Sequence, residues 1–75
     1  MRKVVGGLLY DTDKSELIYT DHVKNRMLYK TKKGRFFMLY QTGEIEERSE
    51  ENVMTYLAER DVDKYMELFG KVEEA

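Results

Sequence analysis

Residues 26–40, RMLYKTKKGRFFMLY, decide the fold of this 75-residue chain. Residues 26–31 and 35–40 are rich in the aromatic and aliphatic side chains that strands favour. Lys32-Lys33-Gly34 lies between them and suits a short hairpin loop in which the glycine takes positive φ. The segment therefore predicts an antiparallel hairpin.

The register of this hairpin depends on the length of its loop. A three-residue loop places Tyr29 opposite Phe37 and Leu28 opposite Met38. A two-residue loop places Met38 opposite Tyr29 instead, and every other pair slides with it. The sequence leaves both registers open, and both put apolar side chains on the two faces of the strands.

The segment before this hairpin predicts further strands. Val4–Tyr10 is apolar around Gly6-Gly7, which indicates a first strand with a bulge or a closely approaching neighbour. Asp11-Thr12-Asp13-Lys14 has turn chemistry, because aspartate side chains bond backbone groups two residues on. Leu17–Thr20 then follows as a second strand, so we expect a hairpin that joins Tyr10 to Leu17.

The segment after the central hairpin changes to helical periods. Glu44–Arg48 is either a short edge strand or a linker, and Ser49 is a good N-cap. Asp61 is a second cap, and Gly70 stops the helix that follows it. The side chains that we expect to be buried are Val53, Met54, Leu57 and Ala58 in the first helix and Val62, Tyr65, Met66 and Phe69 in the second.

These elements predict an α+β fold, an antiparallel β-meander of three to four strands followed by two C-terminal helices packed on one face. The length suits a single small domain, residues 1–75. Residues 1–43 carry nine Lys/Arg and four Asp/Glu, whereas residues 44–75 carry four and eleven, for a net charge of −2. We therefore expect a basic β-rich part, 1–43, and an acidic helical part, 44–75.

The composition excludes several kinds of chemistry. Without cysteine the chain has no disulfide, no thiolate nucleophile and no cysteine-ligated zinc. Asp11 and Asp13 close the apolar run 4–10 without a small-residue cleavage site, and no stretch reaches the roughly 20 apolar residues of a membrane span. We expect a cytoplasmic protein that does not associate with membranes.

Candidates for catalysis and metal binding are weak. His22 beside Asp21 has the chemistry of a general base, but a polar loop histidine is the commoner explanation. Ser15 lies in a turn and Ser49 at a cap, and neither lies in a nucleophile elbow. Asp11-Thr12-Asp13 starts like a calcium loop but lacks its glycine and its final glutamate. We expect no enzyme, no metal and no cofactor.

The basic hairpin is one candidate binding surface. Its cations and aromatic side chains interleave, the arrangement with which single-strand binders grip phosphates and stack bases. The net negative charge opposes binding to a polyanion, and strand aromatics more often pack into a core. The residues of this candidate nucleic-acid site are Arg26, Tyr29, Lys30, Lys32, Lys33 and Arg35.

An acidic cluster is the other candidate surface. Such a surface can mimic a nucleic-acid backbone and bind a basic groove on another protein, although a charge run is usually a solvated helix face. The unlike halves of the chain could also pair to form a homodimer. The residues of the candidate protein-binding site are Glu44, Glu46, Glu47, Glu50 and Glu51.

Three motifs of the chain resemble a group of small proteins from Gram-positive bacteria, their phages and other mobile elements. The motifs are Tyr10-Asp11-Thr12, Leu28–Gly34 with Phe36-Phe37, and Tyr65 with Phe69-Gly70. Members of this group often carry longer Gly/Ser-containing insertions where this chain has only Asp21–Asn25 and Thr42–Glu47. The resemblance brings no activity with it, but it implies a setting in which small proteins often bind and block host factors.

We therefore expect a non-enzymatic protein-binding module. The specific hypothesis is an inhibitor, encoded by a phage or mobile element, of a host nucleic-acid-handling protein, with Glu44–Glu51 as its contact. The alternative is a small nucleic-acid-binding protein that uses the Arg26–Arg35 hairpin.

Overall fold

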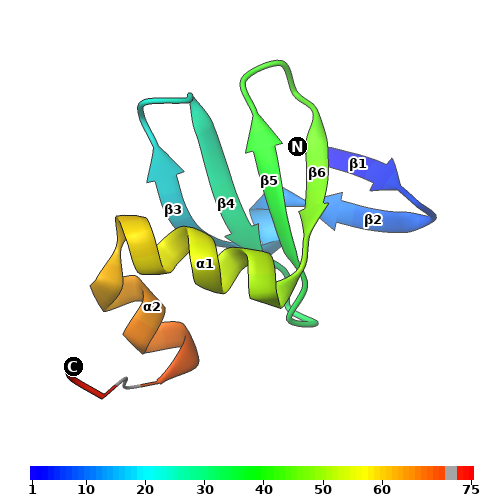
Figure 1. The fold of residues 1–75 in the computed structure, drawn as a ribbon. Helices are drawn as coiled ribbons and strands as arrows, with labels where there is room; N and C mark the ends of the chain where they lie inside the picture. Colours follow the sequence, from blue (N-terminus) through cyan, green and yellow to red (C-terminus); the bar gives the residue numbers. More distant parts are fainter. Residues whose placement is uncertain (71–72) are drawn as a thin grey trace.

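The computed structural model describes residues 1–70 and 73–75. It confirms an α+β fold in which an antiparallel four-stranded meander is followed by two C-terminal helices (Figure 1). The elements in the described residues are β1 (Arg2–Val5), β2 (Leu8–Asp11), the short 3-10 helix η1 (Thr12–Lys14), β3 (Glu16–Asp21), β4 (Arg26–Lys30), β5 (Phe36–Tyr40), β6 (Ile45–Arg48), α1 (Glu50–Arg60) and α2 (Val62–Phe69).

The single bulged strand expected over Val4–Tyr10 is wrong, because this segment contains a tight turn. Gly6 and Gly7 have φ values of 58° and 77° and form a two-residue loop between β1 and β2. Positive φ at both central residues is what a type I′ hairpin turn requires, and glycine adopts it without a steric penalty. β1 and β2 pair antiparallel and form a separate two-stranded sheet.

The expected hairpin between Tyr10 and Leu17 is also wrong. β2 pairs with β1, whereas β3 starts the main sheet, whose strand order is β3-β4-β5-β6. The turn chemistry expected of Asp11 is confirmed, since its carboxylate accepts a hydrogen bond from the Asp13 amide at 3.0 Å. This turn opens η1, and the chain leaves η1 in a different sheet from the one in which it entered (Figure 1).

β4 and β5 form the expected hairpin, in the register of a three-residue loop. Tyr29 lies opposite Phe37, and Leu28 lies opposite Met38. Gly34 takes the positive φ expected of it, 86°. Glu44–Arg48 contains the short edge strand of the two options, because β6 pairs with β5.

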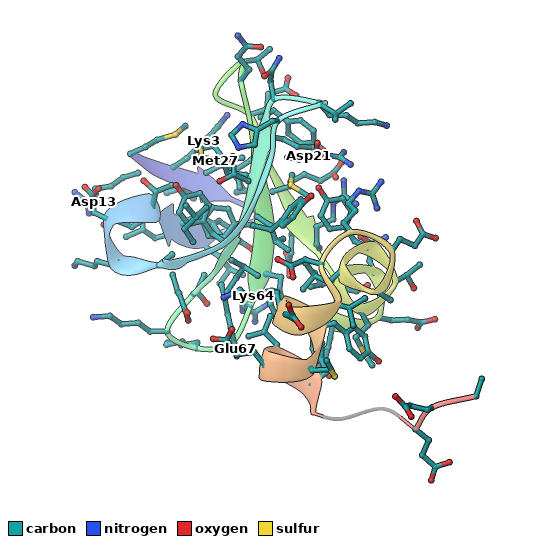
Figure 2. The ribbon with its side chains drawn as sticks, turned by 90° about the vertical axis from the view of Figure 1, so that its left-hand side faces the viewer. Lys3, Asp13, Asp21, Met27, Lys64 and Glu67 are labelled. Carbon is teal, nitrogen blue, oxygen red and sulfur yellow. The ribbon has the colours of Figure 1, made fainter. Side chains whose placement is uncertain are left out.

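The main sheet is covered on both faces. Figure 2 shows it between the β1–β2 hairpin on one side and the two helices on the other. The buried cluster on the helix side consists of Ile18, Leu28, Phe36, Met38, Val53, Tyr56 and Leu57. The buried cluster on the hairpin side consists of Tyr10, Phe37, Leu39 and Ile45.

Both helices begin at the expected caps. The side chains of Ser49 and Asp61 each accept a hydrogen bond from the backbone N–H three residues on, at 3.1 and 3.0 Å. The buried side of α1 differs from the expectation, because Tyr56 is buried and Ala58 is exposed. Val62 in α2 is exposed as well. No helix in residues 1–70 or 73–75 is long and apolar enough to cross a membrane.

Phe37→Ala should lower the free energy of unfolding by about 3–5 kcal/mol, the cost of truncating a fully buried phenylalanine. The ring is completely buried and lies 5.0 Å from the Tyr10 ring and 5.2 Å from the Tyr29 ring, between centroids. Urea denaturation followed by circular dichroism measures the change. The control is Val62→Ala, which should shift stability by no more than about 0.5 kcal/mol. A Phe37 variant as stable as the wild type would show that the hairpin does not pack on β5.

Candidate functional site

The structure separates the two central glutamates of the acidic candidate site. Glu46 lies opposite Met38 and Glu47 lies opposite Phe37, so their side chains point to different faces of the sheet. Glu46 is 2.7 Å from Arg48 Nε, and Glu47 is 3.2 Å from Arg35 Nη1. Each carboxylate therefore has a cationic partner within the protein.

The other three acidic residues lie at opposite ends of β6. Glu44 precedes this strand, and Glu50 and Glu51 follow it in the first turn of α1. The four residues of β6 span roughly 13 Å at about 3.3 Å per residue. The fold therefore does not bring the five glutamates onto one face. Glu50 and Glu51 do lie together, exposed, where their charge suits the positive end of the helix.

Arg26, the first residue of the candidate nucleic-acid site, is engaged in the interior. Its side chain is only 13% exposed, and its Nε lies 3.3 Å from Asp21 Oδ2. Its guanidinium carbon lies 5.2 Å from the centroid of the Tyr56 ring. This guanidinium is already paired with a carboxylate and is poorly placed to bind a phosphate, and its removal would leave the buried Asp21 carboxylate without its cation.

Asp21 is the centre of this interior network. Its Oδ2 accepts a hydrogen bond from the Tyr56 hydroxyl at 2.7 Å, and its Oδ1 accepts the amides of Val23 and Lys24 at 3.1 Å each. The Tyr56 hydroxyl, followed by the Lys24 amide and Arg26, lowers the pKa of Asp21 from 3.8 to about 2, against the opposing effect of burial.

This network leaves the Asp21 carboxylate occupied and unable to orient His22 as a general base. His22 is exposed in the turn between β3 and β4. Elsewhere in residues 1–70 and 73–75, no three His, Cys, Asp or Glu side chains gather closely enough to hold a metal ion.

The aromatic residues of the basic hairpin pack inside the protein. The Tyr29 ring is half-buried and stacks on Phe37, with 5.2 Å between centroids and 10° between planes. Lys30 points to the opposite face, where its Nζ lies 5.7 Å from the centroid of the buried Phe36 ring. In the part of the chain that the structure describes, the exposed large apolar side chains are all aliphatic. The aromatic rings of the described residues are therefore buried or half-buried, which makes them poor platforms for the base stacking that single-strand binders use.

The remaining cations of the candidate site lie around a hollow of about 350 Å³, the β2 groove. The groove is lined by β2, by Lys14-Ser15 at the end of η1, and by residues of the β4–β5 loop, Thr31–Lys33 with Arg35. Arg35 pairs with Glu47, whereas within the described residues Lys14, Lys32 and Lys33 make no ion pair. The structure thus brings Lys32, Lys33 and Arg35 together and leaves Arg26 and Tyr29 out.

Lys14 is the residue that sequence reasoning missed. It lines the β2 groove and also a second hollow of about 550 Å³ that shares Ser15, Thr31 and Lys32 with it. Its position depends on η1 lying beside the β4–β5 loop. That proximity follows from the pairing of β3 with β4, in which Glu16 lies opposite Lys30, and sequence reasoning assigned no register to this pair.

The Asp21 carboxylate should make the stability of the protein fall in acid. Because the pKa of Asp21 is lower in the folded protein than its ordinary 3.8, its contribution is complete above a pH of about 4 and is lost as the pH falls toward about 2. Asp21→Asn should remove this part of the acid dependence, and Tyr56→Phe should weaken it. Urea denaturation at a series of pH values measures the effect, with the exposed Asp63→Asn as control. An Asp21→Asn variant with the wild-type pH dependence would contradict this assignment.

Comparison of the chain with protein-family models, with curated proteins and with solved structures gives no match. The resemblance to small proteins of Gram-positive bacteria therefore stays a prediction. Function is therefore inferred from the chemistry of the surface, above all of the β2 groove.

Proposed function

We propose that this protein is a non-enzymatic protein-binding module that binds an acidic segment of its partner in the β2 groove. The observation that carries the proposal is the combination of side chains in the groove. Leu8 and Leu9 are 36% and 52% exposed, and Lys14, Lys32 and Lys33 lie beside them. Aliphatic surface next to lysines that make no ion pair within the described residues complements a segment that carries both carboxylates and aliphatic side chains.

Nucleic acid receives less support as the partner. Phosphates could meet the same lysines, but bases would find no exposed aromatic ring among the described residues. The net charge of −2 also means that the protein surface outside the groove repels a polyanion. Arg26, which belongs to the candidate nucleic-acid site, donates a hydrogen bond to Asp21.

An inhibitor of a host nucleic-acid-handling protein that uses Glu44–Glu51 as its contact is our second candidate. The exposure of Glu50 and Glu51, side by side at the start of α1, favours it. Glu46 and Glu47 support it less, because each is paired within the protein. The two candidates use different surfaces, so separate variants distinguish them.

The function should be tested by capture with charge-reversed variants. The tagged full chain is incubated with nuclease-treated lysate of Gram-positive bacteria, and retained proteins are identified by mass spectrometry. We expect the wild type to retain one protein at near-stoichiometric amount and Lys32→Glu/Lys33→Glu to lose it, because reversal turns attraction into repulsion. Lys24→Glu is the matched control, since this exposed lysine lies in the β3–β4 turn and should retain the partner.

The outcomes separate the candidates. Loss of the partner on Glu50→Lys/Glu51→Lys, with retention on the double lysine variant, would favour the acidic contact. Nucleic acid retained without nuclease, and proteins lost when nuclease is added, would favour the nucleic-acid alternative and contradict the proposal.

A further inference from the structure

The β2 groove runs along the edge of a strand. All four residues of β2, Leu8–Asp11, line it. Since successive side chains of a strand point to opposite faces, a hollow that touches four consecutive residues lies beside the backbone and not over one face. Among the described residues β2 pairs with β1 alone, so its other edge has no strand beside it (Figure 1).

The turn between β1 and β2 determines which backbone groups face this edge. Gly6-Gly7 forms a two-residue loop, so Val5 and Leu8 next to it are a hydrogen-bonded pair. Hydrogen-bonded and non-hydrogen-bonded pairs alternate along an antiparallel ladder. Leu9, one residue further, therefore points its N–H and C=O away from β1 and toward the groove.

A hydrogen bond elsewhere on β2 supports this alternation. Asp11 lies two residues beyond Leu9, so its backbone groups should point to the same edge. The Ser15 hydroxyl does donate to the Asp11 carbonyl there, at 2.7 Å. The edge is thus capped at Asp11 by η1 and open at Leu9.

We propose that the acidic segment of the partner binds as an extended strand added to the free edge of β2, with its backbone bonded to Leu9. This inference rests on the protein-binding function proposed above and specifies its mode. In strand addition the main-chain hydrogen bonds give affinity, and contacts to alternate side chains give specificity. Carboxylates on the added strand would meet Lys14, Lys32 and Lys33, which line the groove.

The charges at this edge favour an acidic strand and oppose pairing with the same hairpin of a second copy of the protein. Lysine at an open strand edge normally prevents pairing with other strands, because pairing would remove its charge from water or bring it against other cations. The N-terminal hairpin itself carries Arg2 and Lys3, so two copies would bring these cations and the groove lysines together. An acidic segment instead converts the same lysines into attractive contacts.

Peptide selection tests the inference without knowledge of the natural partner. A random library of peptides of about twelve residues, long enough for an added strand, is displayed and selected on the full chain, with Lys32→Glu/Lys33→Glu as counter-target and Lys24→Glu as control. We expect enrichment of peptides in which acidic and aliphatic residues alternate. The enriched peptide is then synthesised with single backbone amides N-methylated in turn. Methylation of the one amide that donates to the Leu9 carbonyl should weaken binding about tenfold, and methylation of the amides on either side should change it little.

Amide hydrogen exchange gives the second readout. On binding, exchange of the Leu9 amide should slow about tenfold or more, while the Tyr10 amide, already in the ladder with Lys3, should change little. Acidic peptides that require the lysines but tolerate N-methylation everywhere and leave Leu9 exchange unchanged would overturn strand addition alone. Failure to enrich acidic peptides, or equal binding to the double lysine variant, would overturn both the binding mode and the proposed function.

Discussion

The burial of β5 on both faces is the constraint on which the other layers depend. Its consecutive side chains enter different cores, Phe36 and Met38 among the helices and Phe37 and Leu39 beneath the N-terminal hairpin. A strand without a solvent face requires a layer on each side, and a chain of this length can bury only about 60% of its unfolded surface. The fold meets this requirement with a short hairpin on one side and a helix pair on the other.

Ion pairs within the fold reduce the number of basic side chains in residues 1–43 that are available to bind a partner. The basic half contributes Arg26 and Arg35 to pairs with Asp21 and Glu47, and neither pair is a free binding surface. Six lysines of the basic half make no ion pair within the described residues, and three of them, Lys14, Lys32 and Lys33, line the β2 groove. The candidate binding surface is therefore formed by charged side chains that have no ion-pair partner in the part of the chain that the structure describes. The density of charge along the sequence does not identify it.

Local signals predicted the elements whose determinants lie within a few residues of one another. The caps at Ser49 and Asp61 and the helix stop at Gly70 were confirmed, and one of the two proposed loop lengths gave the observed β4–β5 register. Gly6-Gly7 carried a signal too, since two adjacent glycines between apolar segments are typical of a two-residue hairpin turn. That signal was interpreted as a bulge, and the error merged two strands into one.

The candidate site was less predictable because it depends on tertiary contacts. The burial of Arg26 requires Tyr56, which reaches Asp21 from 35 residues away along the chain. The apolar periodicity predicted Ala58 rather than Tyr56 on the buried side of α1. Periodicity considers only the apolar positions of the helix, and it contains no information about a hydrogen bond from the Tyr56 hydroxyl to a distant residue. Lys14 lies near Lys32 because η1 leads directly into β3, whose Glu16 lies opposite Lys30 of β4.

The order of the strands has a kinetic consequence. Each strand pair in the described residues joins neighbours in the sequence, so every ladder can close through a short loop. Chains dominated by such local contacts fold quickly, and single hairpins form within about 1–10 μs. The Asp21–Tyr56 hydrogen bond, by contrast, joins residues 35 positions apart and needs α1 packed on the sheet. The strand ladders can therefore close early, and docking of α1, which covers Phe36 and Met38, completes the fold.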